Sequence, residues 1–482
     1  MAEDFNPDIC VIGGGPAGLA AAASTAAAGV SVVLVEKSAL GGSTLTATVP
    51  SKALAAAADL YEALRIGPVL GVSGAPLQVN LSRVRDHVVA ATAEVARTIT
   101  PERLAIQGIR VISGEAVFAD AATVKVGGQV IRARRFIVAV GARWVPPSLP
   151  GLDGVEAMTY ADAFQLDRRP SHLIVLGAGR YALELAQAYT RLGIDATIVA
   201  PGAALADEDP ELAAVVIERL RAEGIRVRAG VTVHQISRRR NGVRIMLTDP
   251  ADAEADGAEI VVDGSHLLVA TGRVAAASGL GLAAAGIVSD GAFIRVDGNL
   301  RTSNRRVFAI GDAVAGTPSV ARAELQAEAV VRSILYRVPR RGGDWLAPRA
   351  VMTDPGLAAV GLGEAAARAR YGEVRVMRYP FGENARARIE RSSAGLLKVV
   401  ATRGGRVLGA GIVGRGAAEL IAPWSLAVAN RLTLSAVGAM VAAFPTRSGA
   451  SAAVAGLDPG SEGASLTAAA VRSIIRFLGK LG

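Results

Sequence analysis

Two segments of this 482-residue chain repeat one pattern of apolar strand, glycine-rich turn, helix and second apolar strand. The first pattern predicts a strand at 8–12, a turn at 13–18, a helix at 19–28 and a strand at 31–35. The second predicts a strand at 173–176, a turn at 177–182, a helix at 183–192 and a strand at 196–199. Strands joined through a helix pair in parallel. We therefore expect an α/β fold that contains two parallel sheets.

The first turn, Gly13-Gly14-Gly15-Pro16-Ala17-Gly18, suits a phosphate-bearing cofactor. Glycines let a pyrophosphate approach the backbone, and the N-terminus of the following helix favours its negative charge. Glu36 ends the next strand, where a carboxylate accepts hydrogen bonds from a ribose. The strand, turn, helix and spaced acid together predict a dinucleotide site.

Composition narrows the possibilities further. The single cysteine, Cys10, lies in an apolar strand, so an intramolecular disulfide is excluded and we expect a buried thiol. The net charge of +9 would suit nucleic acid, but only 4% of residues are aromatic and no nucleic-acid-binding motif is present. The four histidines are scattered, which predicts no metal site.

The uncharged stretch 9–35 is long enough to span a bilayer. It contains a glycine turn near one end and the polar residues Ser24, Thr25 and Ser31, so a strand–turn–helix–strand unit explains it better. The N-terminus is acidic, whereas a signal peptide needs positive charge. We expect a cytoplasmic protein.

Four further motifs follow in order: Gly114-Glu115-Ala116, Ala139-Val140-Gly141-Ala142, Ala270-Thr271-Gly272-Arg273 and Ala309-Ile310-Gly311-Asp312. Together with the two glycine turns and Pro50-Ser51-Lys52, they resemble the pyridine nucleotide–disulfide oxidoreductase family over nearly the whole chain. The resemblance implies two Rossmann-like domains, one for FAD and one for NADH or NADPH, and a C-terminal α+β dimerisation domain. It also implies a homodimer.

The domain boundaries implied by the resemblance follow these motifs. They give an FAD-binding domain at 1–145 and 269–343, an NAD(P)-binding domain at 146–268, a dimerisation domain at 344–460 and a tail at 461–482. Residues 466–482 form a basic amphipathic pattern that can lie on an anionic membrane. The alternative is that this tail packs on its own dimer or frays.

The resemblance also implies which residues contact the two cofactors. They are Gly13, Gly15, Pro16, Ala17, Gly18, Glu36, Lys37, Gly42, Ser43, Lys52, Ala116, Gly141, Gly177, Gly179, Ala182, Glu184, Gly272, Arg273, Gly311 and Asp312. The strand at 196–199 is followed by Ala200-Pro201-Gly202, with neither an acid for a 2′-hydroxyl nor an arginine for a 2′-phosphate. The choice between NADH and NADPH therefore stays open. Arg180, inside the second turn, either approaches a phosphate or faces solvent.

Lys52 and Glu184 match a pair that the family places between flavin and nicotinamide. A cation there stabilises the reduced, anionic flavin, and the carboxylate holds the lysine in place. The alternatives are a loop lysine and a surface glutamate on a helix. Because both members of the pair are present, we expect hydride transfer from NAD(P)H to flavin.

The disulfide chemistry of the family is missing. Thr44 and Thr48 stand at positions comparable to its two cysteines, and a hydroxyl cannot act as a thiolate. The family's C-terminal histidine and glutamate, supplied by the partner subunit, are replaced by Phe444 and Gly449. The resemblance places Phe444 and Arg447 at the partner's flavin.

Three functions are compatible with these residues. The chain most resembles cysteine-deficient NAD(P)H:quinone reductases of the family, in which flavin reduces a small acceptor directly. A soluble pyridine nucleotide transhydrogenase is the second possibility, because its Thr-Ile-Pro-Ser-Lys-Ala-Leu resembles residues 48–54. The third is a non-catalytic flavin-binding subunit, against which the retained Lys52 and Glu184 count.

Overall fold

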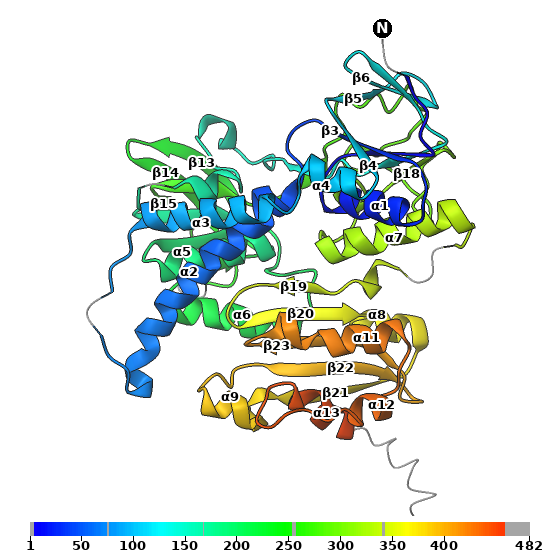
Figure 1. Cartoon of the computed structure of the whole chain (residues 1–482). Coiled ribbons are helices and arrows are strands. Elements are labelled where there is room, and N and C mark those ends of the chain that lie inside the picture. The colour runs from blue at the N-terminus through cyan, green and yellow to red at the C-terminus, as the bar shows by residue number, and fades with distance from the viewer. Residues whose placement is uncertain (1–3, 75–76, 167, 253–256, 340–342, 458–482) are drawn as a thin grey trace, which may run out of the picture. The chain divides into compact units, whose positions relative to one another are not determined.

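The computed structural model describes residues 4–74, 77–166, 168–252, 257–339 and 343–457 (Figure 1). The chain divides into two compact units, one of residues 1–206 and 220–344 and the other of residues 207–219 and 345–482. The tail predicted at 466–482 lies outside the described residues, so its membrane contact stays a prediction. Within the described ranges, no helix is long and apolar enough to cross a bilayer.

A five-stranded parallel sheet in the order β18-β8-β2-β3-β4 forms the first layer of the first unit. Its strands are β2 (Ile9–Ile12), β3 (Val32–Glu36), β4 (Ile109–Ser113), β8 (Arg135–Val138) and β18 (Val307–Ala309). Two helices, α1 (Pro16–Ala27) and α7 (Val320–Tyr336), lie side by side and share a core with this sheet (Figure 1). All four residues of β2 are buried, as expected for a parallel strand covered on both faces.

A second, smaller sheet covers the other face of these strands, in the order β1-β7-β6-β5. Its strands are β1 (Asp4–Phe5), β5 (Ala116–Phe118), β6 (Thr123–Val126) and β7 (Gln129–Arg132). Three helices lie between β3 and β4 in the chain: α2 (Val49–Ile66), α3 (Leu81–Ala96) and α4 (Pro101–Ile106). Helix α2 packs against both α3 and α5 (Arg180–Arg191), and α5 is the helix that follows the second glycine turn.

The segment that contains the second glycine turn also belongs to the first unit and has its own parallel sheet, in the order β12-β11-β10-β16. Its strands are β10 (His172–Leu176), β11 (Asp195–Ala200), β12 (Arg226–Ala229) and β16 (His266–Val269). An antiparallel meander packs on it, formed by β13 (Thr232–Arg239), β14 (Gly242–Thr248) and β15 (Ile260–Gly264). The strands β9 (Ala142–Trp144) and β17 (Arg273–Ala275) pair antiparallel, and each begins at the last residue of one of the motifs 139–142 and 270–273.

Both nucleotide-binding helices begin three residues earlier than the sequence pattern predicts, inside the glycine motifs. Helix α1 begins at Pro16 rather than residue 19, and α5 begins at Arg180 rather than residue 183. In α1, proline at the first helical position needs no N–H partner and has the right φ, so the turn and the helix overlap. Helix α5 begins at Arg180 without a proline. The exposed N–H groups of both helices therefore belong to the glycine motifs themselves.

The second unit contains a five-stranded antiparallel sheet in the order β19-β20-β23-β22-β21. Its strands are β19 (Arg349–Val351), β20 (Gly356–Gly361), β21 (Val374–Pro380), β22 (Leu396–Thr402) and β23 (Val407–Gly414). Its helices are α8 (Glu364–Tyr371), α9 (Ala385–Ile389), α10 (Ala417–Leu420), α11 (Ala422–Ala429), α12 (Leu434–Gly438) and α13 (Gly449–Gly456). Trp424 is fully buried in this core and donates its indole N–H to Ser451 at 3.1 Å.

Residues 207–219, predicted as part of the NAD(P)-binding domain, pack with the second unit, and they include the first ten residues of α6 (Pro210–Ala222). The reason is an ionic cluster around the buried Lys398 on β22. Its ammonium lies 2.8 Å from Asp209, 3.0 Å from Glu211 and 3.1 Å from Glu364. The predicted domain boundaries stay predictions.

Replacing Lys398 by methionine should destabilise the second unit by about 3 kcal/mol, because three carboxylates lose their shared cation in a largely buried site. The control Arg403→Met breaks a pair whose two side chains are each more than 70% exposed and should cost about 0.5 kcal/mol or less. Guanidinium unfolding monitored by tryptophan fluorescence measures both changes. Equal small losses would contradict the prediction.

The same cluster predicts acid lability. A hydrogen bond from Arg378 lowers the pKa of Glu211, and one from Arg368 lowers the pKa of Glu364, with Lys398 lowering both further. Carboxylates with lowered pKa values contribute stability above their ordinary pKa of 4.5 and lose it as the pH falls below that value. Lys398→Met should therefore raise the pH midpoint of acid unfolding.

Candidate active site

The first glycine turn forms a cradle that side chains would fill. Gly13 has φ +108°, and a Cβ there would lie 2.4 Å from the carbonyl oxygen of Ala139. A Cβ on Gly18 would lie 1.8 Å from the carbonyl oxygen of Gly13, so α1 can approach the turn only because residue 18 is glycine. A Cβ on Gly15 would make only an ordinary van der Waals contact, 3.9 Å from the Cα of Gly42. A pyrophosphate group fits this arrangement at the N-terminus of α1.

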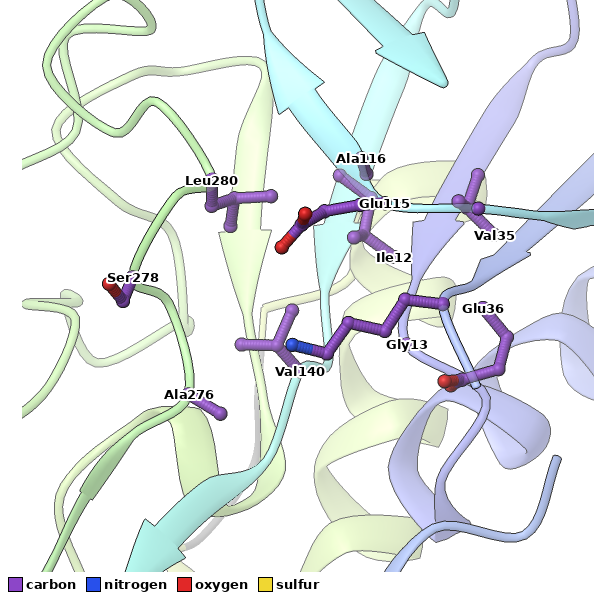
Figure 2. A pocket seen from close by; sticks show the side chains of 12 residues that line it. Ile12, Gly13, Val35, Glu36, Glu115, Ala116, Val140, Ala276, Ser278 and Leu280 are labelled. Carbon is purple, nitrogen blue, oxygen red and sulfur yellow. The ribbon is translucent and has the colours of Figure 1, made fainter. Parts of the chain in front are cut away.

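Beside this turn lies an open groove with an empty volume of about 440 Å³. Figure 2 shows Ala276, Ser278 and Leu280 along one wall and Ile12, Val35 and Ala116 along the other. Lys37, Glu115 and Val140 also line the groove. The carboxylate of Glu36 accepts hydrogen bonds from the Gly14 N–H at 2.6 Å and from Ser38 at 2.8 Å. Apolar walls with one fixed carboxylate suit an adenosine whose ribose hydroxyls donate to Glu36.

Asp312, in the turn that follows β18, lies at the C-terminal edge of the first sheet. Its carboxylate accepts a hydrogen bond from the Arg273 guanidinium at 2.8 Å. Arg273 also lies over the Trp144 ring, 5.4 Å from its centroid, where β9 and β17 pair. Two residues predicted to contact cofactors, Arg273 and Asp312, are thus partners of each other.

Lys52 on α2 and Glu184 on α5 form an ion pair. The Lys52 side chain is 35% exposed, whereas the Glu184 side chain is only 6% exposed. The pair joins the segment of the first glycine turn, which supplies the lysine, to the segment of the second glycine turn, which supplies the glutamate. The predicted pairing is therefore present, and the roles of the two residues in hydride transfer stay predictions.

A second link between the same helices escaped the sequence analysis. Arg191, about two helical turns beyond Glu184, donates to Asp59, about two turns beyond Lys52, at 2.5 Å. Arg191 is also bound through two nitrogens to Glu223, at 2.8 and 3.0 Å, and both of these side chains are buried. The available sequence signal was an acid seven residues after Lys52 and an arginine seven residues after Glu184. The two ion pairs fix how α2 lies along α5.

An aromatic cluster next to Glu184 was also missed. Trp144, Tyr160, Phe164 and Tyr181 have ring centroids 5.1 to 5.6 Å apart. Burial first, and the nearby Glu184 carboxylate second, raise the pKa of the Tyr160 hydroxyl well above its ordinary range, so it stays protonated. Only 4% of the chain is aromatic. The gathering of four of these rings at one place is not visible as a pattern along the sequence.

The second glycine turn has the same geometry as the first. Gly177 has φ +119°, and its Cβ would lie 2.7 Å from the carbonyl oxygen of Ala270, whereas Gly179 faces open space. Ala182, at the third position, is fully buried. Arg180 is half-buried and donates from Nη2 to the Pro318 carbonyl and the Tyr181 hydroxyl, and its approach to a phosphate stays a prediction.

The strand end that should select the nucleotide carries no charge. Ala200 ends β11, Pro201 and Gly202 are exposed, and the Leu205 N–H donates to the Ala178 carbonyl at 2.9 Å. That hydrogen bond folds the following loop back onto the glycine turn. NADH versus NADPH therefore stays undecided.

Thr44 and Thr48 begin and end a π-helical turn that leads directly into α2. A Cβ on Gly42, just before it, would lie 2.9 Å from the Cα of Gly15, so this turn packs against the first glycine turn. Ser43 is exposed between them. The single cysteine lies elsewhere: Cys10 is fully buried in β2, and burial raises its pKa to about 12. A redox-active disulfide within the chain is excluded.

Phe444 and Arg447 lie in the second unit. Phe444 is 87% exposed. Arg447 binds Glu390 and Ser392, and the Thr446 carbonyl accepts a hydrogen bond from Asn384 at 3.2 Å. Their predicted approach to a partner's flavin stays a prediction. In the part of the chain that the structure describes, no three His, Cys, Asp or Glu side chains are arranged to hold a metal ion.

Two family models match the chain. Residues 7–327 match "Pyridine nucleotide-disulphide oxidoreductase", and residues 347–454 match its dimerisation domain. A dihydrolipoyl dehydrogenase of Thermus scotoductus is 33% identical over 455 residues, which cover 92% of this chain and 95% of that protein. A mercuric reductase of Streptomyces lividans is 31% identical over 436 residues, covering 89% and 91%. The crystal structure of LpdA from Mycobacterium tuberculosis superposes with a TM-score of 0.83 at 29% identity, covering 94% and 99%.

The folded holoprotein should show no thiol reactive toward Ellman's reagent at about pH 8, because Cys10 is buried and its pKa is about 12. In guanidinium chloride one thiol per chain should react. Iodoacetamide treatment of the folded protein should leave flavin reduction unchanged. Rapid titration of a thiol in the native protein would contradict the burial of Cys10.

Proposed function

Because this chain belongs to the pyridine nucleotide-disulphide oxidoreductase family, we propose that it takes hydride from NAD(P)H and passes the electrons from flavin directly to a quinone. FAD and NAD(P)H are the cofactors of the family, and the cradle at Gly13–Gly18 and the groove beside Glu36 fit FAD. The family's dimerisation domain supports a homodimer. One observation carries the proposal: the Lys52–Glu184 pair is intact while no thiol lies near it.

FAD, when bound, supplies the two-electron chemistry that joins a hydride donor to an acceptor. The residues of this chain prepare its surroundings. Lys52 places a positive charge that stabilises negative charge developing on the ring, and the buried Glu184 holds the ammonium in position. The second link, Arg191 with Asp59, keeps the two helices in register.

The kind of electron acceptor that we propose follows from the absence of thiols at Thr44 and Thr48. Their hydroxyls neither accept electrons nor form a mixed disulfide, so a substrate must collect both electrons from flavin. One hydride and one proton from solvent convert a quinone into a hydroquinone, which balances the reaction without a protein thiol. A flat, largely apolar acceptor suits a pocket from which thiol and imidazole have been removed. Relatives named for disulfide or mercuric chemistry therefore differ from this chain in the second half-reaction.

Transhydrogenation is the second candidate, and the uncharged end of β11 favours it. Ala200, Pro201 and Gly202 offer no group that rejects either nucleotide. Hydride would then leave flavin toward the oxidised form of the other nucleotide. No thiol is needed for this reaction either.

Lys52→Met should slow anaerobic reduction of bound flavin about a hundredfold, since a preorganised charge beside the reacting ring is lost. FAD content should stay unchanged. Stopped-flow absorbance with NADH and, separately, NADPH measures the rate. The control Lys125→Met removes an exposed lysine on β6 and should leave the rate as in the parent protein.

The acceptor is identified by the second mixing step. Rapid reoxidation by menadione supports the quinone reductase, whereas rapid reoxidation only by the other oxidised nucleotide supports transhydrogenation. Flavin reduction in the parent protein no faster than that of free flavin would overturn both and leave a flavin-binding subunit without turnover.

A further inference from the structure

Two polar side chains are buried in the apolar face of α7. Arg322 is 3% exposed and Gln326 is fully buried, one helical turn apart among Ala323, Ala327 and Val330. Burying a guanidinium and an amide is costly unless every donor and acceptor finds a partner. Their partners therefore indicate what they do.

Both side chains bind the turn that carries Asp312. Gln326 Oε1 accepts the Gly311 N–H at 2.7 Å. Arg322 donates from Nη1 to the Gly311 carbonyl at 3.3 Å and from Nη2 to the Ala315 carbonyl at 2.5 Å. The N–H and the carbonyl of one residue are thus held by two neighbouring positions on one helix.

A carboxylate orients both of these side chains. Asp344 accepts from Arg322 Nε at 2.6 Å and from Gln326 Nε2 at 3.0 Å. The amide of Gln326 can present its oxygen to Gly311 only if its nitrogen points at Asp344. We call Arg322, Gln326 and Asp344 the flavin-loop clamp.

The clamped residue has little freedom to move. Gly311 has φ +68°, and a Cβ there would lie 2.9 Å from the Cβ of Ala17 in the first glycine turn. It precedes Asp312, whose carboxylate is held by Arg273. Fixing both polar groups of Gly311 therefore fixes where Asp312 lies relative to the first glycine turn.

We propose that the flavin-loop clamp positions Asp312 and so sets the affinity for FAD without touching it. This inference rests on the proposed function and on the predicted role of Asp312 as a cofactor contact. It assigns Arg322, Gln326 and Asp344 as positioning residues. An apolar pair at 322 and 326 would leave the Gly311 N–H and the Ala315 carbonyl without these partners, and the Gly311 carbonyl would keep only its bond from the Val314 N–H at 3.3 Å.

The test exchanges the two groups that face each other. In Asp344→Asn the Arg322 guanidinium loses its carboxylate partner, and in Gln326→Glu two carboxylates meet. Each single variant should raise the Kd for FAD about tenfold or more, since hydrogen bonds to charged groups are lost. The double variant restores one carboxylate and one amide. The carboxylate then introduced at position 326 accepts from the Gly311 N–H, and the amide introduced at position 344 donates to that carboxylate. Its Kd should return to within about threefold of the parent value.

Kd is measured by titrating full-length apoprotein with FAD and following flavin fluorescence, and the unfolding midpoint of the apoprotein is recorded in parallel. Glu328→Gln is the matched control, because it breaks an exposed Glu328–Arg332 pair on the same helix. A change in midpoint without a change in Kd would overturn the proposal. Single variants that bind FAD as the parent does, or a double variant no better than the worse single, would also overturn it.

Asp312→Asn separates this inference from the function on which it rests. Weaker FAD binding by Asp312→Asn with unchanged binding by the clamp variants means that the clamp is only structural. Unchanged binding by Asp312→Asn itself means that Asp312 does not hold FAD, and the clamp then has nothing to position.

Discussion

The close contact between Gly18 and the Gly13 carbonyl governs the first half of the molecule. A single methyl group at Gly18 would lie 1.8 Å from that oxygen, so only glycine lets α1 approach the end of β2. This approach places the N-terminus of α1 inside the glycine turn. At the second turn, a Cβ on Gly177 would lie 2.7 Å from the carbonyl oxygen of Ala270, as a Cβ on Gly13 would lie 2.4 Å from that of Ala139. The shape of both glycine turns is therefore set by backbone packing rather than by charged side chains.

Charged side chains act at the next level, where they hold elements that backbone packing leaves adjustable. Lys52 with Glu184, and Asp59 with Arg191, join α2 to α5 at two points. The flavin-loop clamp does the same for the turn after β18. In each case a buried charge has its partner within hydrogen-bond reach, which is the condition under which burial of a charge is tolerated. The Lys52–Glu184 pair is thus one of several links that keep two nucleotide sites in register.

Threonines at the positions of the family's two cysteines change the chemistry that this turn can carry out, but not how the turn and α2 pack. Thr44 and Thr48 occupy a helical turn that still packs on Gly15 through Gly42, and α2 still presents Lys52. The proposed half-reaction with NAD(P)H depends on Lys52 and Glu184, and this ion pair is present. The half-reaction that would use a thiol has no group to carry it, because Cys10 is sealed inside β2. The proposed function therefore uses acceptors that take electrons from flavin directly.

The sequence alone determined the two nucleotide units, because glycine spacing and strand periodicity are local and each has one low-energy fold. It also determined the absence of a disulfide, since one cysteine cannot form one within a chain. Only the tertiary structure decided that Arg191 reaches Asp59, that Arg180 reaches Pro318, and that residues 207–219 pack with the second unit around Lys398. Those contacts join residues far apart in the chain. A pattern read along the chain gives the spacing within one element, whereas partners across elements are chosen by how the elements pack.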